Sequence, residues 1–269
     1  MSTRIIHISD LHLPARDPAQ ACALRTSIGA AKPDVILVSG DITRSGTREE
    51  FAQAEDFIHG LPGKKLVVPG NHDIPAFNLM ERLTQPFRRF EQSFGETEPV
   101  FESKDVLLVG LNTAYGVRLS ADWSLGRATP QKVERAAWII RARKSGRVAL
   151  VACHHPLLGN AQDPYRSRTS GGRDAFVRLA EAGMDILLHG HLHRVASDSL
   201  WVAGHDVRQV GANTALSDRE RGGGSGFNIL DVGQGCYQLS ARVWHNREYV
   251  SESSPDYAGR AIGILEAAS

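Results

Sequence analysis

The feature that most constrains the fold of this chain is a short apolar run that recurs five times and each time ends abruptly in polar residues. The runs lie at residues 5–9, 35–39, 66–68, 148–152 and 186–188. Apolar runs of this length, bounded by turn residues, are typical of strands buried on both faces in a parallel sheet. Because ligands in open α/β sheets bind beyond the carboxyl ends of the strands, we expect the polar residues after the runs to meet at one sheet edge.

The residues that follow the five runs are rich in metal-binding side chains. They read Asp10-Leu11-His12, Gly40-Asp41, Gly70-Asn71-His72-Asp73, Cys153-His154-His155 and His189-Gly190-His191-Leu192-His193. A single Asp-x-His or His-x-His motif is unspecific, but five such blocks in order are not. Carboxylate, imidazole and amide donors together suit borderline divalent ions such as Mn²⁺, Fe²⁺, Zn²⁺ or Ni²⁺. We therefore predict two divalent metal ions as cofactors, with the ligands Asp10, His12, Asp41, Asn71, His154, His191 and His193.

The composition is that of an ordinary globular chain of 269 residues, 42% hydrophobic and 23% charged, with a formal net charge of +1. This charge gives no global basic field of the kind that indicates a nucleic-acid partner. The three cysteines are widely spaced and odd in number, which favours a reducing compartment. We find no signal-peptide pattern and no apolar stretch of the roughly 18 residues that a membrane span needs, so we expect a cytoplasmic protein without a membrane span.

The first half of the chain alternates strand and helix patterns, which predicts a mostly parallel sheet there. Apolar residues at helical spacing mark residues 17–31, and residues 47–50 form a capping-box sequence that predicts a helix start. Residues 76–95 form a further helical segment that Pro86 kinks or divides. The aromatic residues of this segment have two interpretations, since they either belong to the core or form a lid over the site.

After residue 194 the pattern changes to short strands, with candidates at 201–203, 207–210, 227–232 and 237–244. Alternating apolar and polar residues at 237–244 are typical of a half-buried antiparallel strand. From residue 251 onward the sequence is weakly patterned. Because no internal repeat or domain-scale linker is visible, we predict one domain at residues 1–250, with two stacked sheets, and a C-terminal tail at 251–269.

The order of the blocks resembles the calcineurin-like metallophosphoesterase superfamily over about residues 4 to 194. The blocks that carry the resemblance are Asp10-x-His12, Gly40-Asp41, Gly70-Asn71-His72-Asp73, His154-x-Pro156 and Gly190-His191-x-His193. The resemblance implies an α/β fold, a four-layer α/β/β/α sandwich of two mixed sheets flanked by helices. The strands after residue 194 match the family's second sheet less distinctively.

The resemblance also implies a role for each site residue. One metal ion would be held by Asp10, His12 and His193, the other by Asn71, His154 and His191, and both would be bridged by Asp41. His154 rather than His155 is the implied ligand, because the family's ligand lies two positions before a small residue or proline. His72 would stabilise the transition state or protonate the leaving group, and Asp73 would orient His72.

A site of this kind hydrolyses phosphoesters by attack of a metal-bound hydroxide on phosphorus. Serine/threonine protein phosphatases of the superfamily carry a fuller block than the one at residues 40–46 of this chain, which argues against that class. The compact form is more similar to bacterial class III cyclic-nucleotide and glycerophosphodiester phosphodiesterases. We therefore expect an enzyme, a phosphodiesterase whose substrate is a small phosphoester such as a cyclic nucleotide.

Alternatives to this function stay open from the sequence. A Mn²⁺-dependent nuclease resembling the SbcD type would need a basic groove, for which the candidates are Arg82, Arg88, Arg89, Arg166, Arg168 and Arg173. A phosphomonoesterase would use the same metal site. A non-catalytic binding module on the same fold is the most distant alternative, since the chain keeps every expected ligand. A homodimer through exposed strands of the second sheet is also compatible with the sequence.

Overall fold

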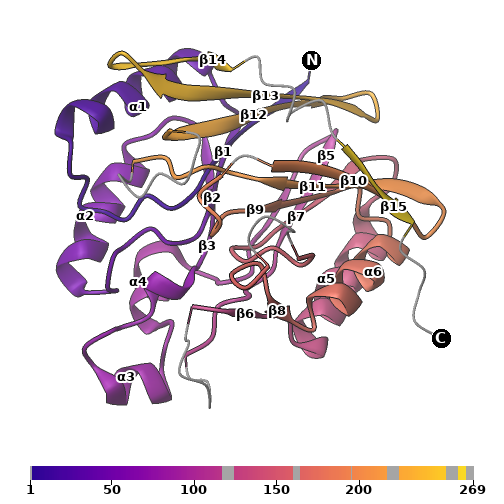
Figure 1. Cartoon of the computed structure of the whole chain (residues 1–269), viewed down its shortest axis with the longest axis horizontal. Helices are drawn as coiled ribbons and strands as arrows, with labels where there is room; N and C mark the ends of the chain where they lie inside the picture. The colour runs from indigo at the N-terminus through magenta and orange to yellow at the C-terminus, as the bar shows by residue number, and fades with distance from the viewer. Residues whose placement is uncertain are drawn as a thin grey trace.

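The computed structural model describes residues 2–116, 124–159, 164–194, 196–216, 224–252 and 260–264. Two stacked β-sheets form the centre of the molecule, and helices cover the outer face of each sheet (Figure 1). α1 (Pro18–Ala31) and α2 (Arg48–His59) lie on one side, and α5 (Pro130–Arg143) and α6 (Gly172–Glu181) lie on the other. This arrangement confirms the predicted four-layer α/β/β/α sandwich.

The first sheet joins N-terminal and C-terminal strands. Its spatial order is β14 (Glu248–Glu252), β13 (Cys236–His245), β12 (Gly226–Gly233), β1 (Thr3–Ile8), β2 (Val35–Ser39) and β3 (Lys64–Val68). β1, β2 and β3 run parallel, as the alternation of strands and helices predicts. β12 pairs antiparallel with β1 and makes the sheet mixed.

The second sheet is built in the same way from the middle of the chain and its end. Its spatial order is β15 (Arg260–Ile264), β10 (Ala196–Val202), β11 (His205–Gly211), β9 (Ile186–His189), β7 (Val148–Ala152), β5 (Val106–Gly110) and β4 (Val100–Glu102). β5, β7, β9 and β11 run parallel. β6 (Gly126–Arg127) and β8 (Thr169–Ser170) pair with each other in a small separate sheet.

The strands after residue 194 divide between the two sheets, whereas we expected them to match the second sheet. β10 and β11 extend the second sheet, and β12, β13 and β14 extend the first. Part of the expected tail at 251–269 is also structured, because β14 continues past residue 250 and β15 pairs parallel with β10. The pairings of β12 with β1 and of β15 with β10 join segments that are distant in sequence, so a local pattern does not reveal them.

Apolar cores hold the four layers together, and alternation along each strand assigns its side chains to one core or another. Along β2, Val35 and Leu37 face the core between the two sheets, whereas Ile36 and Val38 face the core under α1 and α2. β5 and β7 alternate in the same way between the inter-sheet core and the core under α5 and α6. A strand buried on both faces reads as a continuous apolar run, which explains the pattern in the sequence.

The helix signals in the sequence also have structural counterparts. At the start of α2, Glu50 N–H donates to Thr47 Oγ1 at 3.2 Å and Thr47 N–H donates to Glu50 Oε2 at 3.1 Å, which forms the predicted capping box. Residues 76–95 contain two short helices, α3 (Leu79–Thr84) and α4 (Arg88–Phe94), separated around Pro86. Phe90 of α4 is fully buried in the core that α2 covers. Among the described residues, no helix has the length and apolar character needed to cross a membrane.

Candidate metal centre

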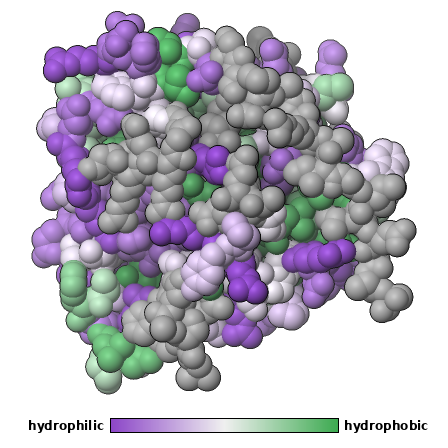
Figure 2. Space-filling model, in the orientation of Figure 1, coloured by the Kyte–Doolittle hydropathy of each residue, from purple (hydrophilic) through white to green (hydrophobic). Residues whose placement is uncertain are grey.

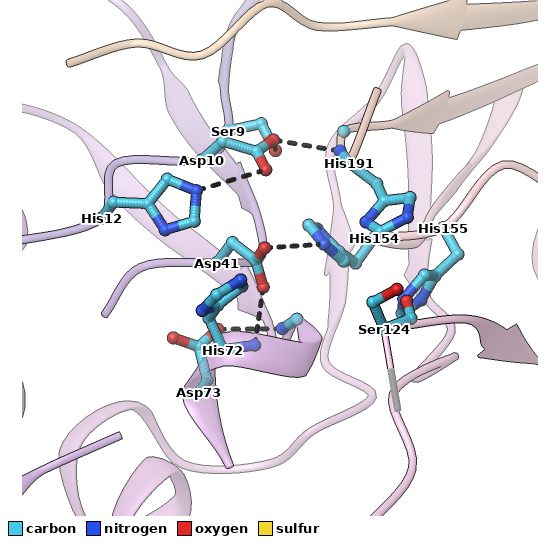
Figure 3. Close-up of polar contacts among 12 residues, drawn as sticks. Ser9, Asp10, His12, Asp41, His72, Asp73, Ser124, His154, His155 and His191 are labelled. Carbon is cyan, nitrogen blue, oxygen red and sulfur yellow. Dashed lines mark hydrogen bonds and ion pairs between the residues drawn. The ribbon is translucent and has the colours of Figure 1, made fainter. Parts of the chain in front are cut away.

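The loops after β1, β2, β3, β7 and β9 converge at one end of the two stacked sheets (Figure 3). The loop after β3 begins with η1 (Asn71–Asp73), a single 3-10 turn. Backbone hydrogen bonds tie the loops to one another: Asp10 N–H donates to Gly40 O at 3.0 Å, and Gly190 N–H donates to His154 O at 3.0 Å. The strand ends therefore bring their polar residues together, as the pattern of runs predicts.

Five predicted ligands have a left-handed backbone conformation, which L-amino acids other than glycine rarely adopt. The φ angle is 52° at Asp10, 47° at His12, 50° at Asp41, 69° at His191 and 52° at His193. This conformation costs roughly 1–2 kcal/mol for each residue. Such strain persists only where the surrounding structure imposes it, and it is concentrated at functional sites.

Two glycines allow the loops to approach the carboxylates closely. A Cβ atom at Gly70 would lie 2.2 Å from Asp41 Oδ1, and a Cβ atom at Gly190 would lie 1.9 Å from Ser9 Oγ. Both distances are too short for any real contact. A side chain at either position would therefore displace a predicted ligand or the residue beside it.

Asp10, His12 and His193 form one group of donors, with ligand atoms within 4.8 Å of one another. Asp10 Oδ1 lies 3.1 Å from His193 Nε2 and 3.9 Å from His12 Nε2. The other oxygen, Oδ2, accepts hydrogen bonds from Ser9 Oγ–H at 2.6 Å and from His191 N–H at 3.0 Å. One carboxylate oxygen is thereby held in place, and the other faces the two imidazoles.

His154 and His191 belong to a second group of donors, whose third member is His155. Asn71 adds a buried oxygen without a hydrogen-bond partner among the described residues. His154 Nδ1–H donates to Ser39 O at 2.8 Å, so Nε2 is the nitrogen that would bind a metal once the ring is neutral. That Nε2 atom lies 3.2 Å from Asp41 Oδ2. The ligand atoms of Asp10, Asp41 and His154 also lie within 4.8 Å of one another, so Asp41 stands between the two groups.

Several polar atoms at this centre are buried and have no hydrogen-bond partner among the described residues. Five of them belong to predicted ligands: Asp10 Oδ1, His12 Nε2, Asn71 Oδ1, His154 Nε2 and His191 Nε2. Asp10 Oδ1 and His154 Nε2 each face an ion-pair partner, whereas His12 Nε2, Asn71 Oδ1 and His191 Nε2 lack a hydrogen bond. A buried polar atom left unpaired costs about 1–3 kcal/mol, so such atoms indicate a missing partner. Divalent cations satisfy carboxylate, amide and imidazole donors together, and the donor set therefore fits a metal centre.

Burial and neighbouring charges place most of these donors in the protonation state that metal binding requires. Burial lowers the pKa of His12 to about 4 and the pKa of His191 to about 3, so both rings are neutral near neutral pH. Burial alone would raise the pKa of Asp10, but His193 and His154 hold it below its ordinary value. Burial would likewise lower the pKa of His154, but the Asp41 carboxylate raises it to about 9. Because a ligand imidazole must be neutral, His154 would release a proton on binding a metal.

His155 lies beside His154 and His191, but hydrogen bonds occupy both nitrogens of its ring. His155 Nε2–H donates to Ser124 O at 2.9 Å (Figure 3), and Nδ1 pairs with Thr113 Oγ1 at 2.9 Å. A neutral imidazole that donates through one nitrogen can only accept through the other. His155 therefore has no lone pair left for a metal, unlike the adjacent His154.

His72 lies beside the first group of donors. Its ring meets the His12 ring edge-on, with ring centroids 4.9 Å apart. His72 Nδ1–H donates to the backbone oxygen of Arg44 at 2.6 Å, which leaves Nε2 as the nitrogen available for chemistry. The Arg44 carbonyl holds the ring directly, and the orientation of His72 by Asp73 stays a prediction.

The Asp73 carboxylate is used to tie loops together. It accepts hydrogen bonds from Thr43 N–H at 2.9 Å and from Gly70 N–H at 2.8 Å, and so joins the loop after β2 to the loop after β3. Burial and the nearby Asp41 charge raise the pKa of Asp73 to about 6. Asp73 therefore acts on the centre through the loops that carry Asp41 and Asn71.

Three residues that hold the donors in place were absent from the sequence prediction: Ser9, Ser39 and Arg44. Ser9 fixes one oxygen of Asp10, the Ser39 carbonyl fixes the tautomer of His154, and the Arg44 carbonyl fixes His72. Two of these contacts use backbone oxygens, which any residue type supplies, so no sequence signal reveals them. Ser9 directly precedes a ligand, and that position was the available hint.

Comparison with known proteins identifies relatives of this chain. Residues 3–195 match the family model described as calcineurin-like phosphoesterase. A probable glycerophosphodiester phosphodiesterase GpdQ from Arcobacter nitrofigilis is 26% identical over 213 residues, which cover 73% of this chain and 74% of the relative. A probable cyclic nucleotide phosphodiesterase from Synechococcus sp. is 25% identical over 206 residues, which cover 72% of this chain and 74% of the relative.

Solved structures share the fold at low sequence identity. A dimetal phosphatase from Danio rerio has a TM-score of 0.60 at 11% identity, and the match covers 88% of this chain and 98% of that one. A purple acid phosphatase from yellow lupin seeds has a TM-score of 0.66 at 11% identity, and the match covers 100% of this chain and 57% of that one. At these identities the likeness concerns the fold alone.

Proposed function

This chain belongs to the calcineurin-like phosphoesterase family, and from that premise we propose that it hydrolyses a small phosphodiester, with a cyclic nucleotide or a related diester as substrate. The chain is a phosphoric ester hydrolase. The proposed diester is supported by the two curated relatives, one named for glycerophosphodiesters and one for cyclic nucleotides. The observation that carries the proposed mechanism is the convergence at the strand ends of five buried donor atoms that have no hydrogen-bond partner among the described residues.

The proposal places two divalent ions at the centre. Asp10, His12 and His193 would hold one ion, Asn71, His154 and His191 would hold the other, and Asp41 would serve both. The position of Asp41 between the two groups supports the bridging role. The hydrogen bonds on both nitrogens of His155 support the choice of His154 as the ligand. The mixed oxygen and nitrogen donors suit Mn²⁺, Fe²⁺, Zn²⁺ or Ni²⁺, and the choice among these ions stays a prediction.

When bound, the two ions supply positive charge that lowers the pKa of a water molecule and stabilises the phosphoryl oxygens. The residues of the chain hold the other parts of the reaction in place. His72 keeps its Nδ1–H on the Arg44 carbonyl and presents Nε2. In the doubly protonated form of the ring, Nε2–H would give its proton to the leaving-group oxygen and leave the ring neutral. Ser9 and the Gly190 turn keep the Asp10 carboxylate in one orientation.

A nuclease is less well supported, because two arginines of the basic groove considered above are committed to the fold. Arg82 is buried and donates to the backbone oxygen of Gly116 at 2.8 Å. Arg89 forms an ion pair with Glu81. Arginines engaged in this way do not neutralise a nucleic-acid backbone. The nuclease and the phosphomonoesterase are therefore outcomes of the experiment below.

A substrate panel with Mn²⁺-loaded protein tests the proposal. It compares bis-p-nitrophenyl phosphate, p-nitrophenyl phosphate, cyclic nucleotides, glycerophosphodiesters and single-stranded DNA, with His154→Ala as the inactive control. We expect a small diester to be hydrolysed fastest. Preference for p-nitrophenyl phosphate over every diester would replace the proposal with a phosphomonoesterase, and DNA cleavage that falls steeply with salt would replace it with a nuclease. Binding of fewer than two metal equivalents per chain would contradict the dinuclear centre.

We also propose a reducing compartment, with the cytoplasm as the place of action. The three cysteines are free thiols, of which Cys153 is buried and Cys22 and Cys236 are exposed. Unpaired thiols are typical of proteins in reducing compartments. Recovery of the native protein from a cytoplasmic fraction, with all three thiols reduced, is the expected result.

A further inference from the structure

α3 and the residues just before it expose large apolar side chains that the proposed function does not use. Phe77 is 85% exposed, Met80 72%, Leu79 57% and Leu83 51%, and these four residues are called the apolar face. Figure 2 shows green residues gathered at the lower left, where α3 lies in Figure 1. The largest exposed apolar patch on a monomer is often functional, and these four side chains lie close together in the sequence of one short segment.

Polar contacts beneath α3 hold the apolar face outward. Arg82 is buried and donates to the backbone oxygens of Gly116 at 2.8 Å and Pro75 at 3.3 Å. Arg89 of α4 forms an ion pair with Glu81 of α3. Rotation of α3 to bury the apolar side chains would break these contacts. The apolar face is thus presented to a partner and is not a lid that folds onto the metal centre.

Positive charge borders the apolar face. A hollow of about 290 Å³ beside it is lined by Met80 and by the exposed arginines Arg48 and Arg88. Neither arginine has an ion pair among the residues that the structure describes. Glu81 also lines the hollow, but its charge is balanced by Arg89. The hollow therefore complements an anionic group next to an apolar one.

The position of the apolar face and the charges beside it favour a lipid surface over a second copy of this chain. α3 lies at the edge of the molecule (Figure 1), where it can enter a bilayer without contact from the rest of the fold. Apolar side chains bordered by arginines are the pattern of segments that bind anionic bilayers at their interface.

We propose that α3 docks this protein on the surface of an anionic lipid bilayer. The apolar face enters the boundary between headgroups and acyl chains, and Arg48 and Arg88 bind lipid phosphates. The proposal is independent of the proposed function, since binding to lipid requires no hydrolysis.

Co-sedimentation with sucrose-loaded vesicles tests the docking. The full chain is mixed with vesicles of phosphatidylcholine alone or of phosphatidylcholine with phosphatidylglycerol, at low and high salt. We expect binding to the anionic vesicles that weakens with salt. Phe77→Ser/Leu83→Ser should weaken binding at least about tenfold, and each of Arg48→Gln and Arg88→Gln should weaken it about fivefold.

Matched variants on other faces of the molecule distinguish docking through α3 from nonspecific adsorption to the vesicles. Trp138→Ser removes another exposed aromatic side chain, and Arg173→Gln removes another exposed arginine, and neither should change vesicle binding. Every variant should keep the circular dichroism spectrum of the wild type and its hydrolysis of a soluble aryl phosphodiester. Equal binding to uncharged vesicles, no binding, or equal loss in the matched variants would overturn the proposal. A dimer in solution that Phe77→Ser/Leu83→Ser dissociates would assign the apolar face to a second copy instead.

Discussion

Replacing Gly190 with alanine tests how closely the metal centre is packed. The new methyl group would lie 1.9 Å from Ser9 Oγ, 2.6 Å from Asp10 Oδ2 and 2.9 Å from Ser9 Cβ. Since real Cβ contacts do not fall below 3.0 Å, the loop or the Ser9 side chain must shift by about an ångström. Overpacking of this kind lowers the free energy of unfolding by about 1–3 kcal/mol.

A double-mutant cycle that combines Gly190→Ala with Ser9→Ala tests whether the Ser9 hydroxyl causes the loss of stability. Ser9→Ala alone removes the hydroxyl that donates to the Asp10 carboxylate at 2.6 Å, which should cost about 1.5–3 kcal/mol. Once that hydroxyl is gone, the alanine methyl at position 190 loses its closest clash. The double mutant should therefore be more stable than the sum of the single mutants predicts, by about 1 kcal/mol.

Urea unfolding of each variant in the presence of a chelator measures these free energies without the stabilisation that a bound metal adds. Gly29→Ala is the matched control, because a Cβ atom there meets nothing within 4 Å and the position lies inside α1. That substitution should stabilise the protein by about 0.5–1 kcal/mol. Additivity of the Gly190 and Ser9 changes within about 0.5 kcal/mol would refute the packing argument.

Further tests address separate parts of the centre. His72→Ala should lower kcat by about 10²–10⁴-fold with both metal equivalents retained; loss of metal in that variant would make His72 a structural residue. His154→Ala should lose metal while His155→Ala keeps it, because hydrogen bonds occupy both ring nitrogens of His155; metal analysis of the two variants decides, and the reverse result would exchange their roles. Cys153 is fully buried and burial raises its pKa, so a thiol reagent should modify the two exposed cysteines in the native protein and Cys153 only after unfolding; fast modification of all three thiols would contradict this burial.

The sequence predicts the central strands and the place of the metal centre because one physical cause produces both signals. Strands such as β2 and β7 are buried on both faces, so their residues form continuous apolar runs. Each run stops where the chain reaches the sheet edge, and the polar residues that follow are therefore the ones at the centre. In the first sheet, β1, β2 and β3 lie side by side in the order in which they occur along the chain, so the sequence is enough to predict their arrangement.

The different roles of neighbouring residues could not be predicted from the sequence, because each role depends on a hydrogen-bond partner from a distant segment. His154 and His155 are neighbours in sequence, and their difference depends on Ser39 for one and on Ser124 for the other. His72 and Asp73 are also adjacent, but they have different partners: the His72 ring contacts the Arg44 carbonyl, whereas the Asp73 carboxylate accepts from backbone N–H groups.

Hydrophobic spacing likewise could not separate the two helices of residues 76–95. Phe90 in α4 and Leu83 in α3 both fit an apolar helix face. Phe90 is fully buried in the core beneath α2, whereas Leu83 is 51% exposed. A pattern shows that a face is apolar, and only the tertiary structure shows whether another layer covers it.

The left-handed backbone at five ligand positions creates a trade-off between the stability of the fold and the activity of the metal centre. Glycine adopts that conformation without strain, so glycine at residue 10, 12, 41, 191 or 193 would relieve up to about 1 kcal/mol while removing a donor from the centre. A screen that selected only for heat resistance of the metal-free chain would therefore enrich glycine at these positions. The most heat-resistant variants from such a screen would be well folded but inactive.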